Sequence, residues 1–240
     1  MTIQERVISL NAGGCAAEGL LVLDDDPGDE RPGVLVCHTI RGRTQFEDDK
    51  ARALAGLGYV ALSVDLYGVE TRGGDIGVMR ELMNGWRADR PGLQRRLHDW
   101  LDELRRQPEV NRGKIAAMGF CFGGLCVLDL ARTGADIAGV ASFHGIFDPP
   151  GNTAANRILA KVLALHGWDD PLAKPDAVVA LAEELTAQGA DWQIHGYGNT
   201  LHAFTNPAAD DKNAGTVYNA SANRRSWTAL QNFLSELFGD

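Results

Sequence analysis

Short apolar runs alternate with amphipathic segments along the chain, which predicts strands that alternate with helices. The run 33–38 is continuously apolar, and this is typical of a strand that is covered on both faces in a parallel sheet. An N-terminal hairpin of strands is also expected, turning through Asn11-Ala12-Gly13-Gly14. The pattern therefore predicts an α/β fold, with a mainly parallel central sheet and helices on both faces. The expected strands are 7–10, 18–23, 33–38, 59–67, 114–118, 137–143, 162–166 and 191–196.

Apolar side chains recur at helical spacing between these strands, as in the stripe that starts at Leu93 and ends at Leu104. The glycine-rich segment 68–92 has two interpretations, a border or lid of a substrate site, or a surface excursion with a short helix at 78–84. No repeat or linker interrupts the 240 residues, so we expect a single domain over 1–240. The expected helices are 46–57, 93–107, 124–132, 175–188 and 223–238.

The formal net charge is -9, which argues against nucleic-acid or anionic-membrane partners because both would be repelled. The cysteines Cys15, Cys37, Cys121 and Cys126 lack metal-type spacing, so we expect reduced thiols and no metal. The N-terminus has no apolar signal core, and no apolar run reaches the roughly 18 residues of a membrane span. A cytoplasmic, soluble protein is expected, as a monomer or homodimer.

The stretch Gly119-Phe120-Cys121-Phe122-Gly123 lies between a predicted strand and a predicted helix. It resembles the G-x-S-x-G nucleophile elbow of α/β-hydrolases, with Cys in place of Ser. Small residues suit such a turn because the central residue is held in a strained backbone conformation. The helix N-terminus would favour a thiolate there. The alternative is that Cys121 is a buried structural cysteine.

A nucleophile of this kind needs an acid and a base on later strand ends. Asp169 and Asp170 follow the strand run 162–166, and either residue could instead cap a turn. His202 lies on a loop after the last long strand, whereas the competing His195 lies inside that strand. His38, His144 and His166 lie near strand ends and could line the site. The order Cys121, acid, His202 is that of α/β-hydrolases, in which the N–H groups of Phe122 and Ile40 would form the oxyanion hole.

These motifs together resemble the dienelactone hydrolase family. The matching pieces are Gly119–Gly124, His166–Pro171, His202–Phe204 and Val64–Tyr67, and they extend over almost the whole chain. The resemblance implies an α/β-hydrolase fold and a Cys121–His202–Asp170 triad, and it selects Asp170 over Asp169. It also implies a hydrolase of small esters or lactones that needs no cofactor and no metal.

The sequence departs from this family at its substrate-binding positions. Thr39 stands where the family has an activating Glu, and Val69 and Asn206 stand where it has arginines that bind a substrate carboxylate. Arg41 or Arg43 could replace those arginines. We expect Thr39, Arg41 and Tyr67 to contribute to the substrate site.

The leading hypothesis is hydrolysis of a small-molecule ester or lactone through a thioester on Cys121. An acyl-transfer or thioester-cleaving enzyme is the first alternative. The second is a non-catalytic protein that binds a small molecule, although such a protein has no need to keep the elbow glycines and all three triad residues. Because the carboxylate-binding arginines are replaced, neutral esters are expected to be better substrates than carboxylate-bearing lactones.

Overall fold

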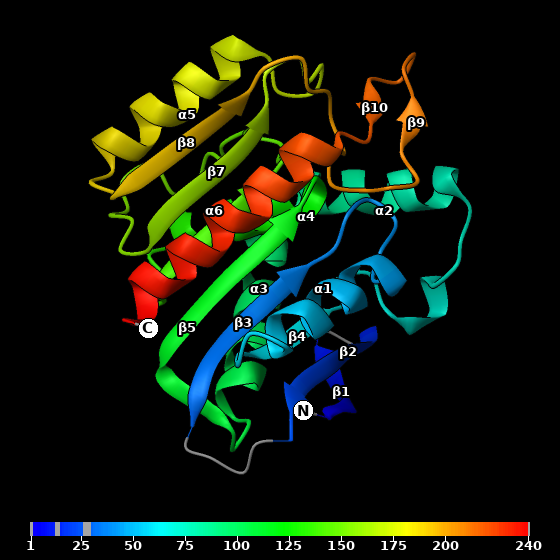
Figure 1. The fold of residues 1–240 in the computed structure, drawn as a ribbon, viewed down its shortest axis with the longest axis vertical. Coiled ribbons are helices and arrows are strands. Elements are labelled where there is room, and N and C mark those ends of the chain that lie inside the picture. The colour runs from blue at the N-terminus through cyan, green and yellow to red at the C-terminus, as the bar shows by residue number, and fades with distance from the viewer. Residues whose placement is uncertain (1, 13–14, 26–29, 240) are drawn as a thin grey trace. The chain divides into compact units, whose positions relative to one another are not determined.

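Strands and helices alternate along the computed structural model of the protein (Figure 1). The structure describes residues 2–12, 15–25 and 30–239. Gly13 and Gly14 of the predicted hairpin turn, and residues 26–29 of the loop after it, lie outside the described residues. The strands are β1 Ile3–Ala12, β2 Cys15–Asp24, β3 Arg31–Cys37, β4 Val60–Val64, β5 Val110–Phe120, β6 Gly139–Phe143, β7 Lys161–Gly167, β8 Trp192–Tyr197, β9 Asp210–Asp211 and β10 Thr216–Val217.

Helices fill the segments between these strands, and the predicted helices are all present with shifted ends. The bounds are α1 Gln45–Ala55, a 3₁₀ turn η1 Val69–Thr71, α2 Ile76–Ala88, α3 Arg90–Arg105, α4 Phe122–Arg132, α5 Pro175–Ala187 and α6 Ala220–Phe238. The short helix expected at 78–84 is wrong in length, because Asp75 caps an earlier start by accepting from the N–H groups of Gly77 and Val78. Sequence patterning missed the short pair β9 and β10.

The chain divides into two compact units, residues 1–117 and 118–240, and β5 runs from one into the other. In the first unit the strands are hydrogen-bonded in the order β1-β2-β4-β3-β5, with β2 antiparallel to both neighbours and β3 parallel to β4. In the second unit the order continues β5-β6-β7-β8, and the pairs β6–β7 and β7–β8 are parallel. The fold is therefore α/β with a mostly parallel sheet, as predicted; the single domain stays a prediction.

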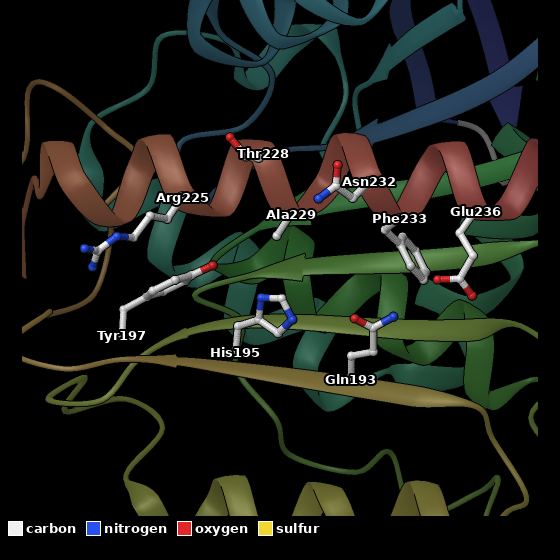
Figure 2. A pocket seen from close by; sticks show the side chains of 9 residues that line it. All are labelled: Gln193, His195, Tyr197, Arg225, Thr228, Ala229, Asn232, Phe233 and Glu236. Carbon is white, nitrogen blue, oxygen red and sulfur yellow. The ribbon is translucent and has the colours of Figure 1, made fainter. Parts of the chain in front are cut away.

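Helices cover both faces of β8 in the second unit. The indole of Trp192 donates to the hydroxyl of Thr186 in α5, whereas the side chains of Gln193 and His195 face α6 (Figure 2). Side chains of a strand alternate between its faces, so one edge strand contacts both helices. Helices on both faces of this strand agree with the predicted α/β architecture.

The turn from β5 into α4 places Cys121 between the two elements, with φ 56° and ψ -113°. A positive φ is unfavourable for a side chain other than glycine, so the surrounding packing must impose it. Gly119 and Gly123 make this packing possible, because a Cβ added at Gly119 would collide with the carbonyl group of Gly123. A Cβ at Gly124 would lie 2.7 Å from the Cα of Gly145. The elbow glycines are thus required by close backbone approach.

Helix α4 is buried along its whole length, which explains its apolar sequence. Its last residue, Arg132, is 1% exposed and is fully engaged. Its guanidinium donates to Glu184 of α5 at 2.6 and 2.9 Å and to the carbonyl oxygen of Phe147 at 3.0 Å. A buried cation that is paired in this way resists displacement, because its loss would leave Glu184 without its partner. The helix that begins at Cys121 is therefore fixed at its other end as well.

We expect Gly119→Ala to lower the free energy of unfolding by about 3 kcal/mol, because the clash is with backbone that cannot rotate away. The matched control is Gly113→Ala in the same strand, where the nearest atom to an added Cβ is Oδ1 of Asn111 at 3.5 Å. That control should stay within about 0.5 kcal/mol of the parent. Chemical denaturation of the three proteins measures this, and equal effects of the two alanines would contradict the packing argument.

Candidate active site

Cys121 is the residue from which the site is built. It is 8% exposed, and its peptide N–H donates to the carbonyl oxygen of Phe143 at the end of β6, at 3.0 Å. It occupies the N-cap position of α4, where the first N–H groups of a helix have no carbonyl partner within the helix. The positive end of the helix dipole therefore lies at the sulfur-bearing residue and favours a thiolate there.

Asp170 and His202 lie in direct contact in the second unit. Oδ2 of Asp170 is 2.7 Å from Nδ1 of His202, and both side chains are almost completely buried. Oδ1 of Asp170 accepts from the N–H of Leu172 at 2.8 Å, so both carboxylate oxygens are satisfied. Asp169 is exposed, and its N–H donates to the carbonyl oxygen of Thr200. The buried carboxylate is thus the one that orients the imidazole.

The backbone around His202 is held by a second loop. Its N–H donates to the carbonyl oxygen of Gly215, and its own carbonyl oxygen accepts from the N–H of Val217. Gly215 has φ 70°, and a Cβ there would collide with the ring of Pro171, the residue after Asp170. The segment that carries the acid and the segment that supports the base therefore interlock, which fixes the two side chains relative to each other.

The charge balance at His202 favours its protonated form. Burial by itself lowers the pKa of His202, but the negative charge of Cys121 and the hydrogen bond to Asp170 outweigh burial and raise the pKa to about 10. Nε2 is buried and has no well-formed hydrogen bond among the described residues. The charge of Cys121 contributes to the raised pKa of His202, which identifies the sulfur as a neighbour of this ring. Loose geometry of this kind is common before a substrate enters. The arrangement suits a thiolate–imidazolium pair.

Two of the other histidines named from the sequence lie close to this group. The ring of His144 is 5.0 Å from the ring of His202 between centroids, and its Nε2 is 2.8 Å from Oγ1 of Thr205. His166 is completely buried at the end of β7, and burial lowers its pKa. The sequence placed both near strand ends but gave no sign of the contact between His144 and Thr205.

His195, the competing base, lies elsewhere in the second unit. It lines a pocket of about 310 Å³ between β8 and α6, together with Tyr197, Arg225 and Phe233 (Figure 2). None of Cys121, Asp170 and His202 lines that pocket. His195 is therefore not positioned to act with Asp170.

The predicted oxyanion loop belongs to the first unit, where it is braced by a buried glutamate. Glu47 is 0% exposed and accepts from the N–H groups of Thr39 at 3.1 Å and Thr44 at 2.9 Å. The pattern Thr44-x-x-Glu47 is a capping box, and this signal could have identified the brace from the sequence. His38 connects the ends of β3 and β4, because Nε2 accepts from the N–H of Leu66 and Nδ1 lies 2.6 Å from the carbonyl oxygen of Thr39. This histidine is structural.

The residues expected to contribute to the substrate site differ in their exposure and in the partners that their side chains already have. Arg43 is held by both carboxylate oxygens of Asp48, at 2.8 and 3.0 Å, so it is already committed to an ion pair. Arg41 is exposed, and Oγ1 of Thr39 accepts its peptide N–H at 3.2 Å. Tyr67 is buried, with its ring edge-to-face against His38 at 4.5 Å. Of the two arginines, only Arg41 keeps an exposed position.

Neither a metal centre nor a membrane span is present in the part of the chain that the structure describes. Among residues 2–12, 15–25 and 30–239, no group of three or more His, Cys, Asp or Glu side chains could hold a metal ion. None of the described helices combines the length and the apolar character that crossing a bilayer requires. All four cysteines are free thiols.

Comparison with known proteins gives matches over nearly the full length. Solved structures that match include one titled m3DLH, 39% identical with a TM-score of 0.93, covering 98% of this chain and 99% of that one. Another is a dienelactone hydrolase-like promiscuous phosphotriesterase from metagenomic libraries, 37% identical with a TM-score of 0.92, covering 98% of both chains. A Saccharolobus solfataricus protein provisionally named a carboxymethylenebutenolidase is 26% identical over 269 residues, which is 96% of this chain and 98% of that protein. The dienelactone hydrolase family matches residues 17–238. The chain belongs to the dienelactone hydrolase family.

Proposed function

We propose that the protein hydrolyses small neutral esters or lactones through a thioester intermediate on Cys121. The observation that carries this proposal is the buried contact between Asp170 and His202, together with the strained Cys121 whose charge raises the pKa of His202. Membership of a hydrolase family supports the reaction type. A buried charged pair costs desolvation energy, and the hydrolase reaction of the family gives the pair of Asp170 and His202 a use that offsets this cost.

The proposed reaction begins with attack of the Cys121 thiolate on the carbonyl carbon of the ester. When the tetrahedral intermediate collapses, the C–O bond to the leaving group breaks and the alkoxide takes the Nε2 proton of His202. Water then attacks the thioester as His202 accepts one of its protons, and the C–S bond breaks to release the acid. Asp170 holds Nδ1 throughout, which fixes the tautomer and stabilises the imidazolium.

The negative oxygen of the tetrahedral intermediate requires hydrogen-bond donors. The N–H of Phe122, the first residue of α4, is the proposed donor in the second unit, where the helix N-terminus adds its positive potential. The N–H of Ile40 stays a prediction from the sequence. The capping box of Thr44 and Glu47 gives the loop that carries Ile40 a fixed conformation in its own unit.

The proposed preference for neutral substrates depends on which residues could pair with a substrate carboxylate. A substrate carboxylate in a dry pocket needs a cation, because an unpaired buried anion is strongly disfavoured. Val69 lies in the turn η1 and cannot pair with it, while Oδ1 of Asn206 accepts from the N–H of Ala208. Arg43 is engaged by Asp48, which leaves only the exposed Arg41 of the two proposed replacements.

A second candidate activity is hydrolysis of neutral phosphotriesters. The observation in its favour is the 37% identity to the promiscuous phosphotriesterase, over 98% of both chains. The Cys121 thiolate would attack phosphorus, the P–O bond to the leaving group would break, and the departing oxygen would take the Nε2 proton of His202. Water would then attack phosphorus as His202 accepts one of its protons, and the S–P bond would break to release the diester and restore the thiolate. Such substrates carry no negative charge, which agrees with Val69 and Asn206 at the positions where the family has carboxylate-binding arginines.

The first prediction concerns the reactivity of Cys121 as a function of pH. Because the pKa of His202 is raised to about 10, the imidazolium should persist through neutral pH and favour the thiolate form of Cys121. We expect the rate of alkylation by iodoacetamide to be nearly constant from about pH 6.5 to 9, whereas an ordinary thiol with a pKa of about 8.5 loses reactivity roughly tenfold per unit below that value. Peptide mass spectrometry should locate the label at Cys121 and leave the buried Cys126 unmodified.

Two matched variants test the acid in the same experiment. Asp170→Asn should slow alkylation at pH 6.5, because it removes the carboxylate charge that stabilises the imidazolium. Asp169→Asn should leave the profile unchanged, since that carboxylate is exposed. A parent profile with a single midpoint near 8.5, or a larger effect of Asp169→Asn, would overturn the assignment.

The second prediction concerns substrate choice. A neutral aryl ester should have a higher kcat/KM than a carboxylate-bearing dienelactone, because the family's arginine positions hold Val69 and Asn206. Steady-state rates with both substrates and with a neutral aryl phosphotriester measure the order. A strong preference for the carboxylate-bearing lactone that Arg41→Ala abolishes would show instead that Arg41 supplies the missing cation.

A further inference from the structure

His144 has a backbone conformation that its side chain does not favour. It follows β6 directly, has φ 37°, and is 1% exposed. Its N–H donates to the carbonyl oxygen of Leu165 in β7 at 2.8 Å. A residue other than glycine keeps a positive φ only where its surroundings impose it, and such residues concentrate at functional sites. The strain at His144 therefore points to a function for the position of its ring.

The close packing around β6 shows why the chain turns at this point. Gly145 leaves no room for a Cβ beside the Oγ of Ser142, and Gly124 of α4 packs against Gly145. The chain after β6 thus passes directly over the N-terminal turn of the helix that follows Cys121. This route carries the ring of His144 toward the residues around the nucleophile.

The ring of His144 lies among aromatic side chains from two segments. Its centroid is 5.0 Å from that of His202 and 5.1 Å from that of Phe204, with interplanar angles of 69° and 80°. The ring of Phe120, the residue before Cys121, is 6.0 Å away. The two edge-to-face contacts, with His202 and Phe204, are favourable at these distances. His144 therefore connects the strand before the nucleophile with the loop that carries the base.

Thr205 fixes the orientation of this ring. Its Oγ1 lies 2.8 Å from Nε2 of His144, and the threonine is 1% exposed. Thr205 belongs to the same loop as His202, three positions further along the chain. A buried hydrogen bond between groups that water cannot reach is costly to leave unmade. The bond thus fastens the His144 ring to the loop whose imidazole it contacts.

The hydrogen bond with Asp170 holds His202 at one atom, Nδ1, so the tilt of the ring about that bond must be set by other contacts of the ring. We propose that His144 is a positioning residue, which acts through its ring contact and its hydrogen bond to Thr205 to hold Nε2 of His202 toward Cys121. This role rests on the proposed function, because it concerns the base of that reaction. His144 itself exchanges no proton with the substrate.

The test is a double-mutant cycle on the hydrolysis of a neutral aryl ester. Thr205→Val removes the hydroxyl with little change in shape, and His144→Phe keeps a ring but removes Nε2. Each single variant should lower kcat about tenfold or more with KM within about twofold, because misplaced catalytic groups slow the chemical step. The double variant should be no slower than the slower single variant, since both changes break the same bond.

Three controls separate positioning from general stability. Thr205→Ser keeps the hydroxyl and should restore kcat to within about twofold of the parent. His195→Phe makes the same substitution in the pocket of Figure 2, which none of the three triad residues lines, and should leave kcat unchanged. Thermal unfolding of each variant shows whether the folded fraction is the same under assay conditions.

Three outcomes would each overturn the role of His144. They are losses of kcat that multiply in the double variant, a loss in Thr205→Ser equal to that in Thr205→Val, and single variants with parental kcat. Cys121→Ala is run beside them. Parental activity in Cys121→Ala would refute the proposed function itself, whereas an inactive Cys121→Ala with unaffected His144 and Thr205 variants would refute only the positioning role.

Discussion

The structure of the second unit depends on the close approach of backbone at the elbow. Gly119 and Gly123 come so near to each other that no side chain fits between them, and this contact forces Cys121 into a positive φ between β5 and α4. The strain is supported by the hydrogen bond from Cys121 to Phe143 and by the complete burial of α4. Favourable packing thus offsets the strain and holds the side chain of Cys121 at a helix N-terminus, where a negative charge is favoured.

The other groups of the candidate site follow from that placement. A thiolate at Cys121 stabilises a positive charge on His202, and Asp170 stabilises the same charge from the opposite nitrogen. Neither charge would be favourable alone in a buried position, so the pair stabilises both. The interlocked loops at Pro171 and Gly215 keep the acid and the base at the distance that this balance needs.

Much of the fold could be predicted from the sequence because its signals are local. Continuous apolar runs indicated the central strands, and glycines around Cys121 indicated the elbow. The chain order of Cys121, an Asp and His202 is also readable, but choosing Asp170 over Asp169 required the family resemblance, since adjacent acids at a strand end look alike in sequence.

The parts that the sequence left out depend on contacts between distant segments. His144 and Thr205 are 61 positions apart, and no pattern relates a strand-end histidine to a loop threonine. The engagement of Arg43 by Asp48 likewise could not be separated from a role in binding substrate, because a loop arginine has the same appearance in both cases. Glu47 is different, since the Thr44-x-x-Glu47 pattern is a local signal in the sequence.

In the proposed reaction Cys121 carries the acyl group during turnover. The most direct measurement is to mix the protein with excess p-nitrophenyl acetate, quench in acid within the first turnover, and map the acetylated peptide by mass spectrometry. We expect a burst of p-nitrophenol equal to the amount of protein, with acetyl on Cys121 as a thioester and no burst from Cys121→Ala. Turnover with the acetyl group on another residue, or with no acylated protein at all, would contradict it.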